Sequence, residues 1–75
     1  MTRKQLEKTV IAIVYEATQE KPTLESRLIE DLGADELEMF RIVMPLEEVF
    51  NIEIPEEVEK GWQTVGDIVK WLRRN

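Results

Sequence analysis

The stretch EDLGADELEMF, residues 30–40, has the composition of an acidic turn that leads into a helix. Asp35 is a favourable residue directly before a helix, because its carboxylate can accept a hydrogen bond from a free N–H of the first turn. Glu38 follows three residues later, so the two residues form a box-like capping pattern. The stretch therefore predicts a helix that begins at Glu36 and continues to about Phe50.

This predicted helix is apolar on two sides. One stripe should face the core and comprises Met39, Ile42, Val43, Leu46, Val49 and Phe50. The second comprises Leu37, Phe40 and Met44, beside Glu47 and Glu48. A helix that is apolar on two sides is either deeply buried or has a partner, and so short a chain cannot bury it all round. We expect an exposed apolar patch with an acidic rim; the alternative is that these residues pack beneath the neighbouring loop.

Pro45 lies inside the same helix. Its ring removes the hydrogen bond to the carbonyl of Arg41 and clashes with the preceding turn, at a cost of about 3 kcal/mol in an ideal helix. We therefore expect a kink at Pro45 or a helix broken into two parts.

Three further helices fit the remaining sequence. The first spans about residues 2–18, where Thr2 and Gln5 form a capping box and the apolar stripe is Leu6, Val10, Ile13, Val14 and Ala17. A short third helix lies within residues 51–61, between Pro55 in its first turn and Gly61 at its end. The last helix begins after Thr64, with Asp67 three residues on and with Val65, Ile68, Val69 and Leu72 facing inward. The fold class is all-α: a four-helix bundle in a single domain, residues 1–75.

The first loop is long, at about residues 19–34. A loop of this length without structure is uncommon in a compact domain. We expect its apolar residues to hold it across the helices; they are Leu24, Leu28, Ile29 and Leu32. Trp62 and Trp71 are expected to close the ends of the core.

The composition excludes several functions. The chain has 75 residues and contains neither cysteine nor histidine, so it lacks thiolate metal ligands, the commonest general base and the commonest nitrogen ligand. A calcium loop beginning at Asp31 would need glycine and glutamate where Glu36 and Ile42 stand. We therefore expect neither an enzyme nor a metal site. No apolar run approaches the ~20 residues of a membrane span, and the first nine residues do not resemble a secretory signal, which predicts a cytoplasmic protein without membrane contact.

The net charge of −6 is concentrated in one segment. Residues 30–60 carry eleven acidic and two basic side chains, whereas the flanking segments carry a small positive excess. Nucleic acid is an unsuitable partner, because phosphate contacts need clustered Lys and Arg. The segment is either a solvated acidic surface or a docking surface for the basic surfaces of partner proteins, and its continuity favours docking.

The run EDLGADELEMFRIVMPLEEVFNIEIPEE, residues 30–57, resembles the acyl carrier protein family. Bacterial members have Asp-Leu-Gly-Ala-Asp-Ser-Leu, then a helix ending Leu-Glu-Glu-x-Phe, then Glu-Ile-Pro. TVGDIVKWL, residues 64–72, resembles the last helix of that family, and the alignment needs no gap from about residue 28 to residue 72. The resemblance implies a bundle of four helices with a long first loop and a short third helix.

The resemblance also implies a function. Members carry a 4'-phosphopantetheine arm on the serine of Asp-Ser-Leu, and their second helix is recognised by synthases and by the transferase that adds the arm. Asp35 and Leu37 match that motif, but the residue at the serine position is Glu36. A partner-contact role is carried over to Met44, Glu47, Glu48 and Glu53. Arg41 and Pro45 depart from the usual docking helix.

Glu36 changes the expected chemistry. The arm is joined by a phosphodiester to a hydroxyl oxygen, and a carboxylate cannot form that link. An acid in the first turn also interacts favourably with the helix dipole, by about 0.3–1 kcal/mol. We therefore expect no cofactor on this chain, and 4'-phosphopantetheine only if residue 36 is serine in the natural protein.

Two interpretations follow. The chain is an acyl carrier protein-like domain of fatty-acid or polyketide-type biosynthesis that cannot take the arm at Glu36. Alternatively, it is a scaffold or regulatory module that uses the same fold to bind proteins. We expect a monomer whose partners are synthase-like or transferase-like enzymes, met through Leu37, Phe40, Met44 and the neighbouring glutamates. In the scaffold or regulatory interpretation, partners bind through the face of Leu37, Met44 and Glu48.

Overall fold

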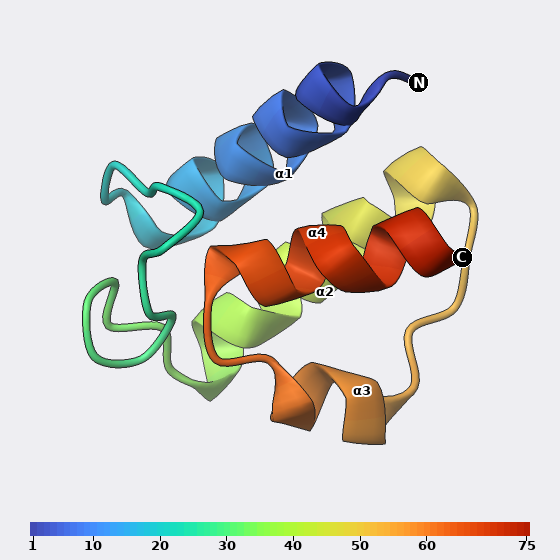
Figure 1. The fold of residues 1–75 in the computed structure, drawn as a ribbon. Coiled ribbons are helices and arrows are strands. Elements are labelled where there is room, and N and C mark those ends of the chain that lie inside the picture. The colour runs from blue at the N-terminus through green and yellow to red at the C-terminus, as the bar shows by residue number, and fades with distance from the viewer.

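The computed structural model describes residues 1–75 and contains four α-helices. Their bounds are α1, Arg3–Thr18; α2, Glu36–Phe50; α3, Glu56–Gly61; and α4, Val65–Arg74. α1 packs against both α2 and α4, and α3 lies apart at the edge of the bundle (Figure 1). The predicted all-α bundle with a long first loop and a short third helix is confirmed.

All three predicted capping boxes are present. In the box before α2, the N–H of Glu38 donates to Asp35 Oδ1 at 2.9 Å, and the N–H of Asp35 donates to Glu38 Oε1 at 3.3 Å. Thr2 with Gln5 and Thr64 with Asp67 make the same reciprocal pair before α1 and α4. Each box satisfies backbone N–H groups that have no partner within the helix, which fixes the three helix starts.

One apolar core joins α1, α2, α4 and the first loop. Its most deeply buried side chains belong to Val10, Val14, Leu28, Ile42, Leu46, Val65 and Ile68. The helix α3 contributes no fully buried residue; only Val58 packs partly against the core. α3 is therefore the helix with the least burial to hold it in place.

The long first loop is attached to the start of α4. The N–H groups of Val65 and Gly66 donate to the carbonyls of Ser26 and Leu24 at 3.1 and 2.8 Å, and Leu28 N–H donates to the Gln63 carbonyl at 2.9 Å. The loop carbonyls thereby satisfy free N–H groups of the first turn of α4. Leu28 and Leu32 are buried and Leu24 packs partly against the core, as predicted.

Three predictions about apolar residues are wrong. Ile29 is 69% exposed, because it follows the buried Leu28 in the part of the loop that pairs with residues 63–64, where successive side chains point to opposite sides. Val49 is 54% exposed, because Leu46 and Phe50 occupy the core side of the last turn of α2.

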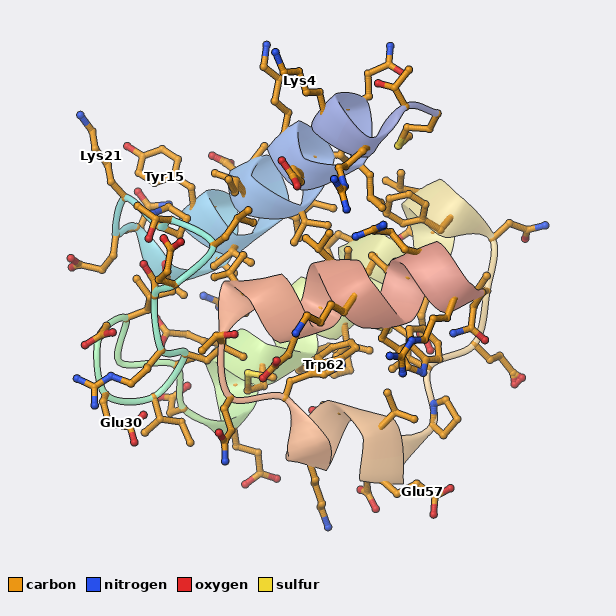
Figure 2. The ribbon with its side chains drawn as sticks, viewed as in Figure 1. Lys4, Tyr15, Lys21, Glu30, Glu57 and Trp62 are labelled. Carbon is orange, nitrogen blue, oxygen red and sulfur yellow. The ribbon has the colours of Figure 1, made fainter.

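The third error concerns the tryptophans. Trp62 and Trp71 meet edge to face, with ring centroids 6.1 Å apart, and so do not close opposite ends of the core. Trp62 lies between α3 and α4 (Figure 2), where its ring is buried.

α2 is not broken at Pro45. The helix continues from Glu36 to Phe50 with Pro45 inside it, so of the two expected outcomes the break is wrong and the kink stays a prediction. The fully buried Ile42 and Leu46 lie on either side of Pro45 along the core face. Their burial offsets the hydrogen bond that the proline ring removes.

Candidate functional site

Glu36 is the first helical residue of α2, and its side chain is exposed. Asp35 is exposed as well, but its carboxylate is engaged by the N–H of Glu38. The position occupied by Glu36 is therefore open to an approaching protein and is held in place by the cap beneath it.

The second apolar stripe of α2 is exposed. Leu37, Phe40 and Met44 are 56%, 58% and 41% exposed, so the predicted patch is confirmed and the alternative of packing under the loop is wrong. We call these three residues the α2 patch. Exposure of three large apolar side chains side by side is typical of a surface that binds another protein.

A groove of about 670 Å³ lies beside the α2 patch, between α2 and α3. It is lined by the three patch residues, by Val43 and by four carboxylates: Glu36, Glu47, Glu56 and Glu59. We call it the acidic groove. Three of its glutamates, Glu36, Glu56 and Glu59, also line a second hollow of about 650 Å³ that extends beneath the first loop towards Trp62.

Glu59 is the carboxyl group most affected by this arrangement. Partial burial raises its pKa, and the negative charges of Glu56, Glu47 and Glu36 raise it further, while Lys60 acts in the opposite direction. Glu56 and Glu59 stand three residues apart and so share one side of α3. Glu57, by contrast, points away from the molecule (Figure 2). The sequence prediction missed Glu56 and Glu59, although their spacing was the available signal.

Glu47 differs from the other predicted docking residues. Its Oε2 accepts a hydrogen bond of 2.8 Å from the N–H of Ile54, and the side chain is half-buried. Ile54 is buried in the connection from α2 to α3, so Glu47 helps to hold that connection. Glu48 and Glu53 are exposed and have no hydrogen bond or ion pair, which leaves them free for contact with a partner.

No hydroxyl side chain is present around the start of α2. Residues 27–63 contain no serine, threonine or tyrosine. Ser26 and Thr23 lie in the first loop, where the N–H of Thr23 donates to Ser26 Oγ at 2.8 Å and the two hydroxyls are 3.3 Å apart. Neither belongs to the α2 patch or the acidic groove.

Comparison with known proteins agrees with this fold. Residues 5–72 match the family model described as "Phosphopantetheine attachment site". The acyl carrier protein of Wolinella succinogenes is 44% identical over 68 residues, covering 91% of this chain and 90% of that protein. The acyl carrier protein of Clostridium perfringens is 42% identical over 65 residues, covering 87% and 86%. The chain belongs to the acyl carrier protein family.

A solved structure supports the same family. A putative acyl carrier protein from Mycobacterium tuberculosis superposes with a TM-score of 0.85 at 27% identity, covering 92% of this chain and 96% of that one. None of the four helices is both long enough and apolar enough to cross a membrane. Its acidic side chains form no cluster with the arrangement of a metal site.

The residues at the start of α2 do not fit the group that gives the family its description. A phosphodiester needs a hydroxyl oxygen, and Glu36 supplies a carboxylate in a segment that contains no hydroxyl side chain. No step through phosphopantetheine can therefore be derived at residue 36 of this chain.

Proposed function

We propose that this acyl carrier protein family member docks on enzymes of fatty-acid or polyketide-type biosynthesis without carrying the arm itself. The observation that carries the proposal is Glu36: an exposed carboxylate at the first position of α2, where the family motif has serine. The carboxylate stabilises the start of the helix through the dipole and offers no oxygen for a phosphodiester.

The docking surface comprises the α2 patch and the carboxylates around it. Leu37, Phe40 and Met44 supply apolar contact area, and the surrounding glutamates attract basic groups. Electrostatic attraction of this kind mainly speeds association, and it weakens as salt screens the charges. The proposed partners are basic surfaces of synthase-like or transferase-like enzymes, met by a monomer in the cytoplasm.

The chain is not proposed to catalyse a reaction. The sequence contains no histidine or cysteine, and the one carboxyl group with a raised pKa in the acidic groove, Glu59, has only other carboxylates and Lys60 as charged neighbours. A general base needs a bound reactant within hydrogen-bond reach, and four like-charged carboxylates favour a cationic surface instead.

A scaffold or regulatory role is the second candidate. The α2 patch is exposed with Glu36 in place and needs no arm to be presented to a partner. Under this interpretation the chain occupies docking surfaces on enzymes that would otherwise receive an arm-bearing carrier. It would then slow the reactions of that carrier in proportion to its own concentration.

The test compares the unaltered chain with Glu36→Ser. Each is incubated with coenzyme A and a broad-specificity phosphopantetheinyl transferase, and intact masses are measured. We expect no mass gain for the unaltered chain and the mass of one arm on Glu36→Ser, because the change restores Asp-Ser-Leu on an exposed first turn. Gain of the arm by the unaltered chain would contradict the proposal and direct attention to Ser26.

A competition assay separates the two roles. The unaltered chain is added to a transferase reaction that loads the Glu36→Ser variant. If α2 docks with Glu36 in place, the unaltered chain should inhibit loading competitively, and rising salt should weaken the inhibition. Glu48→Lys in the unaltered chain is the matched change, because Glu48 is exposed and forms no hydrogen bond or ion pair within the chain; it should weaken the inhibition. Absence of inhibition at low salt would contradict docking by the unaltered chain.

A further inference from the structure

Arg41 is an isolated cation on an acidic surface. It is the one basic residue of α2, and the segment of residues 30–60 contains only one other, Lys60. Lys60 is paired with Glu56 at 3.7 Å, whereas Arg41 is exposed and forms no ion pair. The guanidinium of Arg41 is therefore available to a group outside the chain.

The neighbours of Arg41 on α2 do not neutralise it. The residues four before and four after it are Leu37 and Pro45, which carry no charge. Glu38, three residues before it, has its Oε1 engaged by the N–H of Asp35 in the capping box. The helix thus lacks the acidic residue at i+4 or i−4 that usually pairs with an arginine.

A second element packed beside Arg41 also leaves it unpaired. A groove of about 340 Å³ between α1 and α2 is lined by Arg41, Pro45 and residues of α1 that include Glu16. Glu16 is the acidic residue of that groove, and it forms no ion pair with Arg41. Arg41 stands at the border between this groove and the α2 patch, since Leu37 and Met44 lie four residues before it and three after it.

We propose that Arg41 is a specificity residue, and that the α2 face fits a partner protein whose basic docking surface contains one carboxylate opposite Arg41. The inference rests on the proposed docking function and names the chemistry of the partner. The planar fork of arginine binds a carboxylate through two parallel hydrogen bonds, and arginine is enriched at the centres of protein interfaces. Its position beside Leu37 and Met44 means that docking on the patch removes water from the guanidinium.

A uniformly basic partner is disfavoured by the same geometry. Such a partner would leave the guanidinium unpaired or place a like charge against it, and both are unfavourable at an interface. Arg41 therefore separates two classes of basic surface that Glu48 and Glu53 alone would attract equally.

The test measures charge coupling at Arg41. The probe is a broad-specificity phosphopantetheinyl transferase whose surface lysines and arginines around the carrier site are changed to glutamate one at a time. Loading of Glu36→Ser is compared with loading of Glu36→Ser carrying Arg41→Glu or Arg41→Gln, and kcat/KM is the readout. Circular dichroism confirms that each exposed substitution leaves the helical content unchanged.

One transferase position should show a reciprocal effect. There, the change to glutamate should raise kcat/KM about two- to fivefold for the chain with Arg41 and lower it by a similar factor for Arg41→Glu. Arg41→Gln should respond weakly, and adding Glu16→Gln should leave the coupling intact. The coupling should shrink as salt rises.

Two outcomes would overturn the inference in distinguishable ways. Loading of Glu36→Ser without reciprocal coupling at any position would show that the docking function holds and that Arg41 does not select the partner. Loading of neither Glu36→Ser nor the double variant with Arg41→Glu would overturn the docking function and the inference with it.

Discussion

Glu47→Ala should destabilise the protein more than removal of the neighbouring glutamate, because Glu47 has a structural partner. Its Oε2 accepts the N–H of Ile54 at 2.8 Å, at a half-buried position. Truncation leaves that N–H without an acceptor, and the loss of a hydrogen bond to a charged group at such a site costs about 1–2 kcal/mol. A chain of 75 residues has an unfolding entropy of about 0.16 kcal/mol/K, so the melting temperature should fall by about 6–12 °C.

Two matched variants isolate the hydrogen bond from the charge. Glu48→Ala removes the same charge one residue away, where the side chain is exposed and unpaired, and should shift the melting temperature by no more than about 3 °C. Glu47→Gln removes the charge but keeps an acceptor oxygen, so it should retain most of the stability. The melting temperatures come from circular dichroism at 222 nm, and hydrogen exchange at the Ile54 amide should speed up in Glu47→Ala alone.

Melting of Glu47→Ala and Glu48→Ala within a degree or two of each other would refute a structural role for the Glu47 hydrogen bond. Equal instability of Glu47→Gln and Glu47→Ala would refute it too, since the charge rather than the hydrogen bond would then matter. Confirmation would have a practical consequence: charge reversal at Glu47 tests folding and docking together, whereas Glu48 and Glu53 test docking alone.

Two further predictions concern pH and backbone packing. The pKa of Glu59 is raised in the folded state, so ionisation of Glu59 opposes folding: the penalty is absent well below pH 4.5 and develops as pH rises through the folded pKa. Glu59→Gln should therefore raise the melting temperature at pH 7 and have little effect near pH 3.5; an equal effect at both values would contradict the assignment. A Cβ at Gly66 would lie 3.0 Å from the Leu24 carbonyl oxygen, whereas a Cβ at Gly61 meets nothing within 4 Å. Gly66→Ala should lower thermal stability and loosen the first loop, while Gly61→Ala should be neutral or stabilising, and the opposite order would show that the loop yields freely.

The helix starts could be predicted from sequence because they depend on neighbours within three residues. The side chains of Thr2, Asp35 and Thr64 each accept a hydrogen bond from an N–H in the first turn of the helix that follows. In each case the side chain of the residue three positions later accepts a hydrogen bond from the backbone N–H of the capping residue. Such contacts are determined by residue type and spacing, whatever the rest of the chain does. The exposure of the α2 patch could be predicted for a related reason: a helix apolar on two sides exceeds what a small core can cover.

The errors arose where burial depends on which element lies opposite. Val49 continues an apolar stripe of α2, and Ile29 continues an apolar run of the loop, yet each lies beyond the area that neighbouring helices cover. The contact between Trp62 and Trp71 depends on how α3 leads into α4, which periodicity does not describe. An apolar stripe predicts which side of its own helix a side chain lies on. It does not predict how far along that side the neighbouring elements bury the residues.

The candidate site was predicted in part. The residues of α2 were identified because they share one helix, and the helical repeat determines which face of α2 each side chain lies on. The carboxylates that α3 contributes were missed, because their closeness to Glu36 depends on where a short helix without fully buried residues comes to lie. The same holds for Glu47, whose hydrogen bond joins residues seven apart across the end of α2.

Glu36 acts in two ways that reinforce each other. As a carboxylate it lacks the oxygen chemistry for the arm, and at the same place it adds a negative charge to the acidic groove, where it contributes to the raised pKa of Glu59. Serine at this position would accept the arm and would also make the groove less acidic. The proposed loss of covalent loading and the proposed attraction of basic surfaces towards the α2 patch therefore have the same cause, the carboxylate of Glu36. Arg41 is the one opposing charge on that helix, and its effect on partner choice should be larger because every nearby acidic side chain attracts the same basic partners.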